Sequence, residues 1–144
     1  MTGAPTELLI DRLQVAAERA PHEICVGGLS NAEMWASSGA VASWLIARDF
    51  GRPSRPIPVA ASAHPDRAVF LVGALRAGAL VVIGGQEAPL ELDGVPFAAL
   101  ARCSVDAAVA ERRLHIAAET PAQLRGGLCL CHGDLATIAQ MLAF

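Results

Sequence analysis

The sequence contains no lysine and no tyrosine, so all 11 of its basic side chains are arginines. Without lysine the chain cannot form a Schiff base, supply the lysine of a Walker-type phosphate loop or carry out lysine-dependent acyl activation. Aromatic residues make up 4% of the chain and charged residues 17%. The net charge is −3 and no stretch carries a basic cluster, which excludes nucleic-acid binding through a phosphate footprint.

The 144 residues are 53% hydrophobic, which favours one domain over residues 1–144 with a sizeable core. Glu7 and Asp11 interrupt the first apolar stretch, unlike the basic start and apolar centre of a signal peptide. The longest apolar run, 68–85, contains Arg76 and several glycines, which favours a buried helix and strand over a membrane span. We expect a cytoplasmic protein with reduced cysteines that does not enter a membrane.

The first half of the chain alternates between helical and extended patterns. Ser30 and Glu33 form a capping box that opens a long helix, and Pro58 indicates either an edge position for its strand or the end of that strand. The apolar stretch 79–83 is typical of a strand that is buried on both faces. The predicted elements are helix 6–20, strand 23–26, a helix from Ser30, strand 56–61, helix 65–77 and strand 79–83. This order predicts an α/β fold in three layers, with a mainly parallel sheet flanked by helices.

The second half has weaker patterns. It predicts a strand or turn at 90–94, a short helix at 96–102 and a strand at 114–118. The chain then continues with an irregular stretch at 119–127, a strand at 128–131 and a helix at 135–142 that Asp134 caps. No internal repeat or linker divides it, so a single domain is expected.

Four motifs follow one another between residues 29 and 83. LSNAEMW at 29–35 is similar to the helix start "LTYxEL", and ASWL at 42–45 followed by Gly51 resembles the helix end "A-x-x-L…G". IPVA at 57–60 corresponds to a "V-A-V" strand, and ALRAGALVV at 74–82 resembles "LKAGxAYVPLD". In this order they resemble the N-terminal domain of the adenylate-forming superfamily, which includes acyl-CoA synthetases and nonribosomal peptide synthetase adenylation domains. The resemblance implies a fold like the first part of that domain.

The tail contains a further match and a departure. GLCLCHGDL at 127–135 resembles the "GVxxxHxxL" that follows the family's phosphate-binding loop, "TSGTTGxPKG". The loop itself corresponds here to ETPAQLRGG at 119–127, which has one hydroxyl and keeps its glycines at the far end. Backbone amides cradle a phosphate where glycines allow the required conformation. We therefore expect no cofactor, and no complete adenylating enzyme, since the family's later motifs would lie beyond residue 144.

The resemblance favours a non-catalytic interaction or scaffolding module derived from an adenylation domain, in a carrier-protein-dependent natural-product pathway. In the parent fold this half packs on a second subdomain, so its apolar face would need another partner. The partners expected are a second copy in a homo-oligomer or a larger biosynthetic protein, with a carrier protein as one candidate. A mean hydropathy of +0.44 agrees with a buried face. The candidate anchors are Trp35, Trp44, Phe50, Phe97 and Phe144.

An enzyme is the alternative hypothesis, either split or repurposed, with acyl or adenylyl chemistry. Its candidate catalytic residues are His132, Asp134, His115 and Cys131, and Arg125 is the candidate ligand-binding residue. These side chains would have to converge in a cleft near the former phosphate site. A third hypothesis is a small-ligand binding domain that uses the carboxyl ends of the strands.

Cys129, Cys131 and His132 raise the question of a metal site. On a strand Cys129 and Cys131 share one face while His132 points to the other, so the three do not converge. The candidates for a further ligand, Cys103 and His115, show no recognised spacing. The sequence therefore predicts no metal site.

Overall fold

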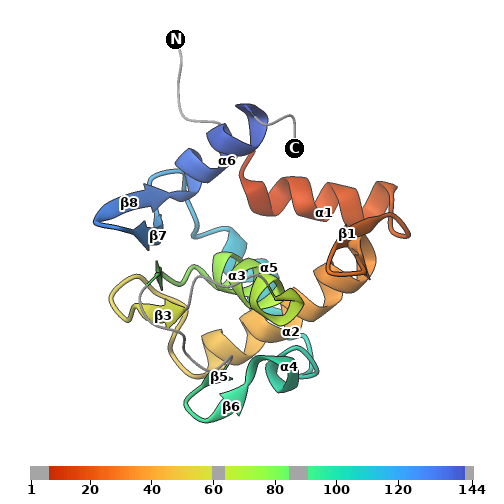
Figure 1. The fold of residues 1–144 in the computed structure, drawn as a ribbon, viewed down its shortest axis with the longest axis horizontal. Coiled ribbons are helices and arrows are strands. Elements are labelled where there is room, and N and C mark those ends of the chain that lie inside the picture. The colour runs from red at the N-terminus through yellow and green to blue at the C-terminus, as the bar shows by residue number, and fades with distance from the viewer. Residues whose placement is uncertain (1–6, 60–63, 85–90, 142–144) are drawn as a thin grey trace.

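The computed structural model describes residues 7–59, 64–84 and 91–141 (Figure 1). It is a mixed α/β structure whose helices pack against one principal sheet. Its helices are α1 (Leu9–Arg19), α2 (Asn31–Ala47), α3 (Pro65–Ala77), α4 (Phe97–Leu100), α5 (Ala108–Arg113) and α6 (His132–Met141). Its strands are β1 (Ile24–Val26), β2 (Leu29–Ser30), β3 (Ile57–Val59), β4 (Val81–Ile83), β5 (Glu91–Leu92), β6 (Val95–Pro96), β7 (Pro121–Arg125) and β8 (Leu128–Cys131).

Helix α2 is the central element and is surrounded by α1, α3, α4 and α5. Its start confirms the predicted capping box: the Ser30 hydroxyl accepts from the Glu33 amide, and the Glu33 carboxylate accepts from the Ser30 amide, both at 3.1 Å. Every residue from Ser38 to Ser43 is buried. A helix with small and apolar residues on all sides is therefore enclosed by its neighbours.

Helix α3 crosses α2 at very short range. The helix begins with Pro65 and ends at Gly78, which has a φ of +78°, as the sequence predicts. A Cβ atom at Gly73 would lie 2.5 Å from Cγ1 of Val41 and 3.0 Å from the backbone oxygen of Ser38. The absence of a side chain at Gly73 therefore allows the two helices to approach each other.

The principal sheet has the strand order β3-β4-β7-β8. β3 is parallel to β4 and β4 is parallel to β7, whereas β8 is antiparallel to β7. With α3 between them, β3 and β4 form a βαβ unit. The sheet is thus mainly parallel, and the exposed Pro58 lies on an edge strand, which is one of the two positions predicted for it.

One face of the sheet is open at β3 and β4. Ile57, Val59, Val81 and Ile83 pack in the main core with residues of α2 and α3, whereas Pro58 is exposed and Val82 is 36% exposed. The expectation that 79–83 is buried on both faces is wrong at Val82, and residues 7–59, 64–84 and 91–141 form no third layer over these two strands. The physical reason is that α2 and α3 lie on the same side of the sheet, as Figure 1 shows.

Three short hairpins share one turn geometry, with positive φ at both central residues. The φ values are +59° and +79° at Gly27–Gly28, +51° and +79° at Asp93–Gly94, and +54° and +84° at Gly126–Gly127. This is the type I′ turn, whose twist matches that of paired antiparallel strands. Each hairpin leads into a helix: β1–β2 into α2, β5–β6 into α4, and β7–β8 into α6.

Two predictions for the second half are wrong. The stretch 114–118 forms turns after α5, a helix that the sequence analysis did not predict, and 119–127 contains the five-residue strand β7. β7 is a strand because it hydrogen-bonds to β4 on one side and to β8 on the other. Its own composition, with Pro121 and Gln123, does not favour a strand.

The buried residues form two clusters. The larger joins α2, α3, α4, α5, β3 and β4, and contains Phe70 and Phe97 stacked with ring centroids 3.9 Å apart. The smaller contains Leu8 and Ile10 near α1, with Ile116 and Ala122 near β7. None of the helices in the described part of the chain is long and apolar enough to cross a membrane.

We predict that Gly73→Ala destabilises the protein although alanine favours helices by about 1 kcal/mol over glycine. The new methyl group would collide with Val41 and the Ser38 carbonyl. Overpacking of this kind costs about 1–3 kcal/mol, so urea denaturation should show a lower free energy of unfolding. The control is Ala36→Gly at an exposed position of α2, which should cost about 1 kcal/mol through propensity alone. A Gly73→Ala variant as stable as the wild type would contradict the close crossing.

Candidate functional site

His132 is buried at the start of α6, with 1% of its surface exposed. Its backbone amide donates to the Thr120 carbonyl at 3.0 Å, and the next amide, of Gly133, donates to Ala118 at 2.7 Å. These bonds hold the first turn of α6 against the segment before β7. Burial, with the nearby positive charge of Arg113 as a second cause, lowers the pKa of His132 to about 4. The imidazole is therefore neutral at neutral pH, and its Nε2 atom is buried without a partner among the described residues.

Asp134 and Cys131 contact each other at the N-terminus of α6. The Asp134 carboxylate accepts from the Cys131 backbone amide at 2.9 Å and lies 3.1 Å from the Cys131 thiol. The backbone hydrogen bond lowers the pKa of Asp134, with a further contribution from the thiol. Asp134 thus caps its helix from within the first turn, three residues after Cys131. The contact is a capping arrangement and does not include His132.

Arg125 lies at the carboxyl end of β7, opposite Ile83 of β4. The side chain is exposed, and its Nε atom donates to Oε1 of Gln123 at 3.1 Å. Burial lowers the pKa of Arg67 in α3, and the nearby positive charge of Arg125 lowers it further. The carboxyl edge of the sheet therefore carries positive charge at a place where open α/β sheets bind ligands.

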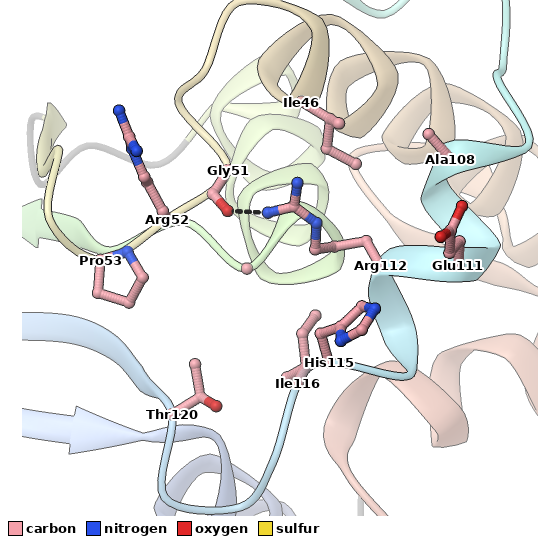
Figure 2. Close-up of a pocket in the computed structure, with 11 residues that line it drawn as sticks. Ile46, Gly51, Arg52, Pro53, Ala108, Glu111, Arg112, His115, Ile116 and Thr120 are labelled. Carbon is pink, nitrogen blue, oxygen red and sulfur yellow. Dashed lines mark hydrogen bonds between the residues drawn. The ribbon is translucent and has the colours of Figure 1, made fainter.

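His115 lines a hollow of 470 Å³ between α5, the segment after α2 and the segment before β7. Figure 2 shows Arg112 and His115 on the α5 side, with Pro53 and Thr120 across from them. Arg112 donates from Nη1 to the carbonyl of Gly51, and the same atom lies 3.4 Å from the carbonyl oxygen of Ala77. The Arg112 guanidinium thus supplies a hydrogen-bond donor to one carbonyl group in the segment after α2 and to another at the last residue of α3.

The polar side chains of the hollow do not form a hydrogen-bonded pair with one another within the described residues. The Thr120 hydroxyl accepts from the Ala117 amide at 3.0 Å, and within the described residues no hydrogen bond joins His115 to Glu111 or Thr120. General-base activation of a hydroxyl requires such a contact. Of the five residues proposed for the enzyme hypothesis, His115 lines this hollow, and His132, Asp134, Cys131 and Arg125 do not.

The aromatic residues proposed as anchors lie mostly in the core. Phe50 and Phe97 are 5% and 3% exposed, so they are core residues and do not present their rings to a partner. Trp44 is half-buried, stacks on Phe50 with centroids 6.1 Å apart, and packs against the larger cluster. Trp35 is half-buried on the smaller cluster. The nine-residue spacing of the two tryptophans puts them on opposite sides of α2, and both are half-buried because other elements pack on both sides of this helix. Phe144 lies outside the described residues.

The residues that sequence analysis missed are arginines. Arg76, Arg112 and Arg113 each bind main-chain carbonyls, and Arg113 also pairs with Asp11. For Arg76 the signal was present, because it is the one charged residue between Ala68 and Gly85. A lone charge in an apolar run is either exposed or bound to partners. The four cysteines are free, and the described residues contain no group of three His, Cys, Asp or Glu side chains that could hold a metal ion.

We predict that His132 makes the protein sensitive to mild acid. The folded state keeps the imidazole neutral down to about pH 4, whereas the unfolded chain binds a proton near pH 6.5. Stability should therefore fall as the pH is lowered from 6.5 to 4, by roughly 3 kcal/mol in total. Urea midpoints measured across this range should show a steep fall for the wild type and a shallow one for His132→Gln.

The control for this prediction is His115→Gln, since His115 is exposed. This variant should keep the wild-type pH dependence. Equal slopes for wild type and His132→Gln would show that His132 is not the group that titrates.

The chain was also compared with known proteins. No family model matches it, and no curated protein matches it either.

Proposed function

We propose that this chain is a non-catalytic interaction module that docks through the open face of its principal sheet. The resemblance of segment 29–83 to the adenylate-forming superfamily supports its derivation from an adenylation domain, in a natural-product pathway that uses carrier proteins. The observation that carries the proposal is a row of uncharged side chains across all four strands of the sheet. The five proposed enzyme residues do not converge in one cleft: Cys131 and Asp134 contact each other, His132 is buried, and His115 alone of the five lines the 470 Å³ hollow, which supports a binding role over a catalytic one.

The row consists of Pro58, Val82, Leu124 and Cys129, one residue from each strand. The register pairs Pro58 with Val82, Val82 with Leu124 and Leu124 with Cys129, so all four share one face. Pro58, Val82 and Cys129 are exposed, and Leu124 is half-buried. We call these four residues the open-face row. Contiguous uncharged surface of this kind is typical of an interface.

We assign a second copy of this chain as the occupant. The open-face row carries no charge that would select a charged partner, and its four uncharged side chains complement the same row on another copy. Related by a two-fold axis, two copies would bury the row against itself, which is the commonest arrangement of homo-oligomers. The neighbouring Leu128 on edge strand β8 is 61% exposed and would extend the contact. A larger biosynthetic protein, such as one with a carrier domain, is the alternative occupant, which a wild type that is monomeric in the test below would favour.

We predict that the wild type has twice the mass of the 14.9 kDa chain in light scattering at tens of micromolar. Val82→Glu should shift it to the monomer, because two buried carboxylates would face each other across the two-fold axis. Val15→Glu is the matched control, since Val15 is 38% exposed on α1 and Val82 is 36% exposed on β4. This control should remain a dimer.

Val82→Thr provides a second test, because threonine retains the strand preference while it removes apolar area. It should raise the dimer dissociation constant without a change in the circular dichroism spectrum. A wild type that is monomeric at these concentrations would refute self-association. Equal effects of Val82→Glu and Val15→Glu would place the interface elsewhere.

A further inference from the structure

A second hollow, independent of the open-face row, lies on the helical side of the molecule. It measures 550 Å³ and is lined by residues of α1, α2, α3 and α5 and by the residues before α5. Its apolar wall includes Ile10, Trp35 and Val109, and its charged groups are Arg76, Arg113 and Asp106. We call it the Arg76 pocket. Its size and its mixture of apolar wall and few polar groups are typical of a small-molecule site.

Arg76 is the most deeply buried charged group of this pocket. Its side chain is 8% exposed, and its guanidinium carbon lies 3.6 Å from the centre of the Trp35 ring. Nη1 donates to the Trp35 carbonyl at 2.6 Å and to the Ser38 hydroxyl at 3.0 Å. A Cβ atom at Gly39 would lie 2.9 Å from Nη1, so the guanidinium occupies the space that this glycine leaves. The planar group is thus fixed in one orientation before any ligand binds.

The positive charge of Arg76 has no ion-pair partner among the described residues. The two hydrogen bonds of the Arg76 side chain both come from Nη1. Its Nε and Nη2 atoms make none within the described part of the chain. Burial lowers the pKa of Arg76 to about 10, so the group is still charged at neutral pH. A buried cation without a counter-charge is costly unless something else supplies the negative charge.

The other charged groups of the pocket are already occupied. Arg113 binds Asp11 through two hydrogen bonds, of 2.8 Å from Nε and 2.6 Å from Nη2. The Asp106 carboxylate accepts from the Ala108 amide at 2.9 Å and forms no ion pair with Arg76. An incoming ligand would therefore meet one unpaired positive charge and one carboxylate. This balance favours a ligand with a single negative charge over a phosphate dianion.

We propose that the Arg76 pocket binds a small monocarboxylate with an apolar body, whose carboxylate pairs with the free edge of Arg76. Nε and Nη2 form the two-donor edge that matches the two oxygens of a carboxylate. The apolar body would lie against Ile10, Trp35 and Val109. Aromatic and branched aliphatic acids combine these features.

The test is thermal unfolding of the full chain with benzoate as the probe, at constant ionic strength and pH 7. At ten times its dissociation constant, benzoate should raise the Tm by about 4 °C. Benzamide has the same ring without the charge and should raise the Tm by much less. Phenyl phosphate, as the dianion, should also bind more weakly than benzoate because Asp106 faces the same space.

Arg76→Met removes the charge and keeps most of the side-chain length. This variant should remain folded, since replacement of a buried charge by an apolar group is often neutral or stabilising. It should lose the Tm shift with benzoate. Arg102→Met removes an exposed arginine from another part of the surface and should keep the shift.

Gly39→Ala keeps the charge but displaces the guanidinium from its place on α2, and it should weaken benzoate binding at least tenfold. Should Arg76→Met fail to fold, the comparison of benzoate with benzamide on the wild type still decides the matter. Equal shifts from benzoate and benzamide, or a full benzoate shift in Arg76→Met, would overturn the proposal. Tighter binding of phenyl phosphate would overturn the assignment of a monocarboxylate.

Discussion

The close crossing of α2 and α3 is the constraint on which the rest of the structure depends. At Gly73 the missing side chain admits Val41, and at Gly39 the missing side chain admits the guanidinium of Arg76. The two helices therefore approach each other through one glycine from each. Val41 and Ala74 at this crossing then belong to the same core cluster as the buried face of β3 and β4. One helix pair thus fixes both the hydrophobic core and the position of a buried charge.

This arrangement also explains why the two proposed binding surfaces lie apart. Helices α2 and α3 pack on the same face of the sheet, so Pro58 and Val82 on the other face remain exposed. On the helical side, α1 and α5 pack around the same helix pair and line the space in front of Arg76. An interface on the sheet and a ligand in the helical layer would therefore not compete for the same residues.

Local signals in the sequence were sufficient to predict α2, α3 and strands β1, β3 and β4, but not the short strand β2. The capping box at Ser30, Pro65 with Gly78, and the edge position of Pro58 each depend on a residue's own backbone chemistry. Strand β7 and the exposure of Val82 were not predictable, because the first depends on pairing with β4 and β8 and the second on which face the helices cover. The same limit applies to the candidate site. The sequence shows that Cys131, His132 and Asp134 lie close together along the chain, but it does not predict that His132 is buried against residues 118–120.

In this chain without lysine, the arginines Arg76 and Arg113 make contacts that a lysine could not make. Arg76 stacks on Trp35 while it donates to a carbonyl and a hydroxyl, and Arg113 binds Asp11 with two parallel bonds while it donates to Ile116. A lysine ammonium is compact and strongly hydrated, and it can form neither the flat stack nor the two-pronged ion pair. A guanidinium keeps its charge at any ordinary pH even where burial lowers its pKa. In a chain without lysine, arginines therefore supply the oriented cations, of which Arg76 is buried and Arg113 is half-buried and paired with Asp11.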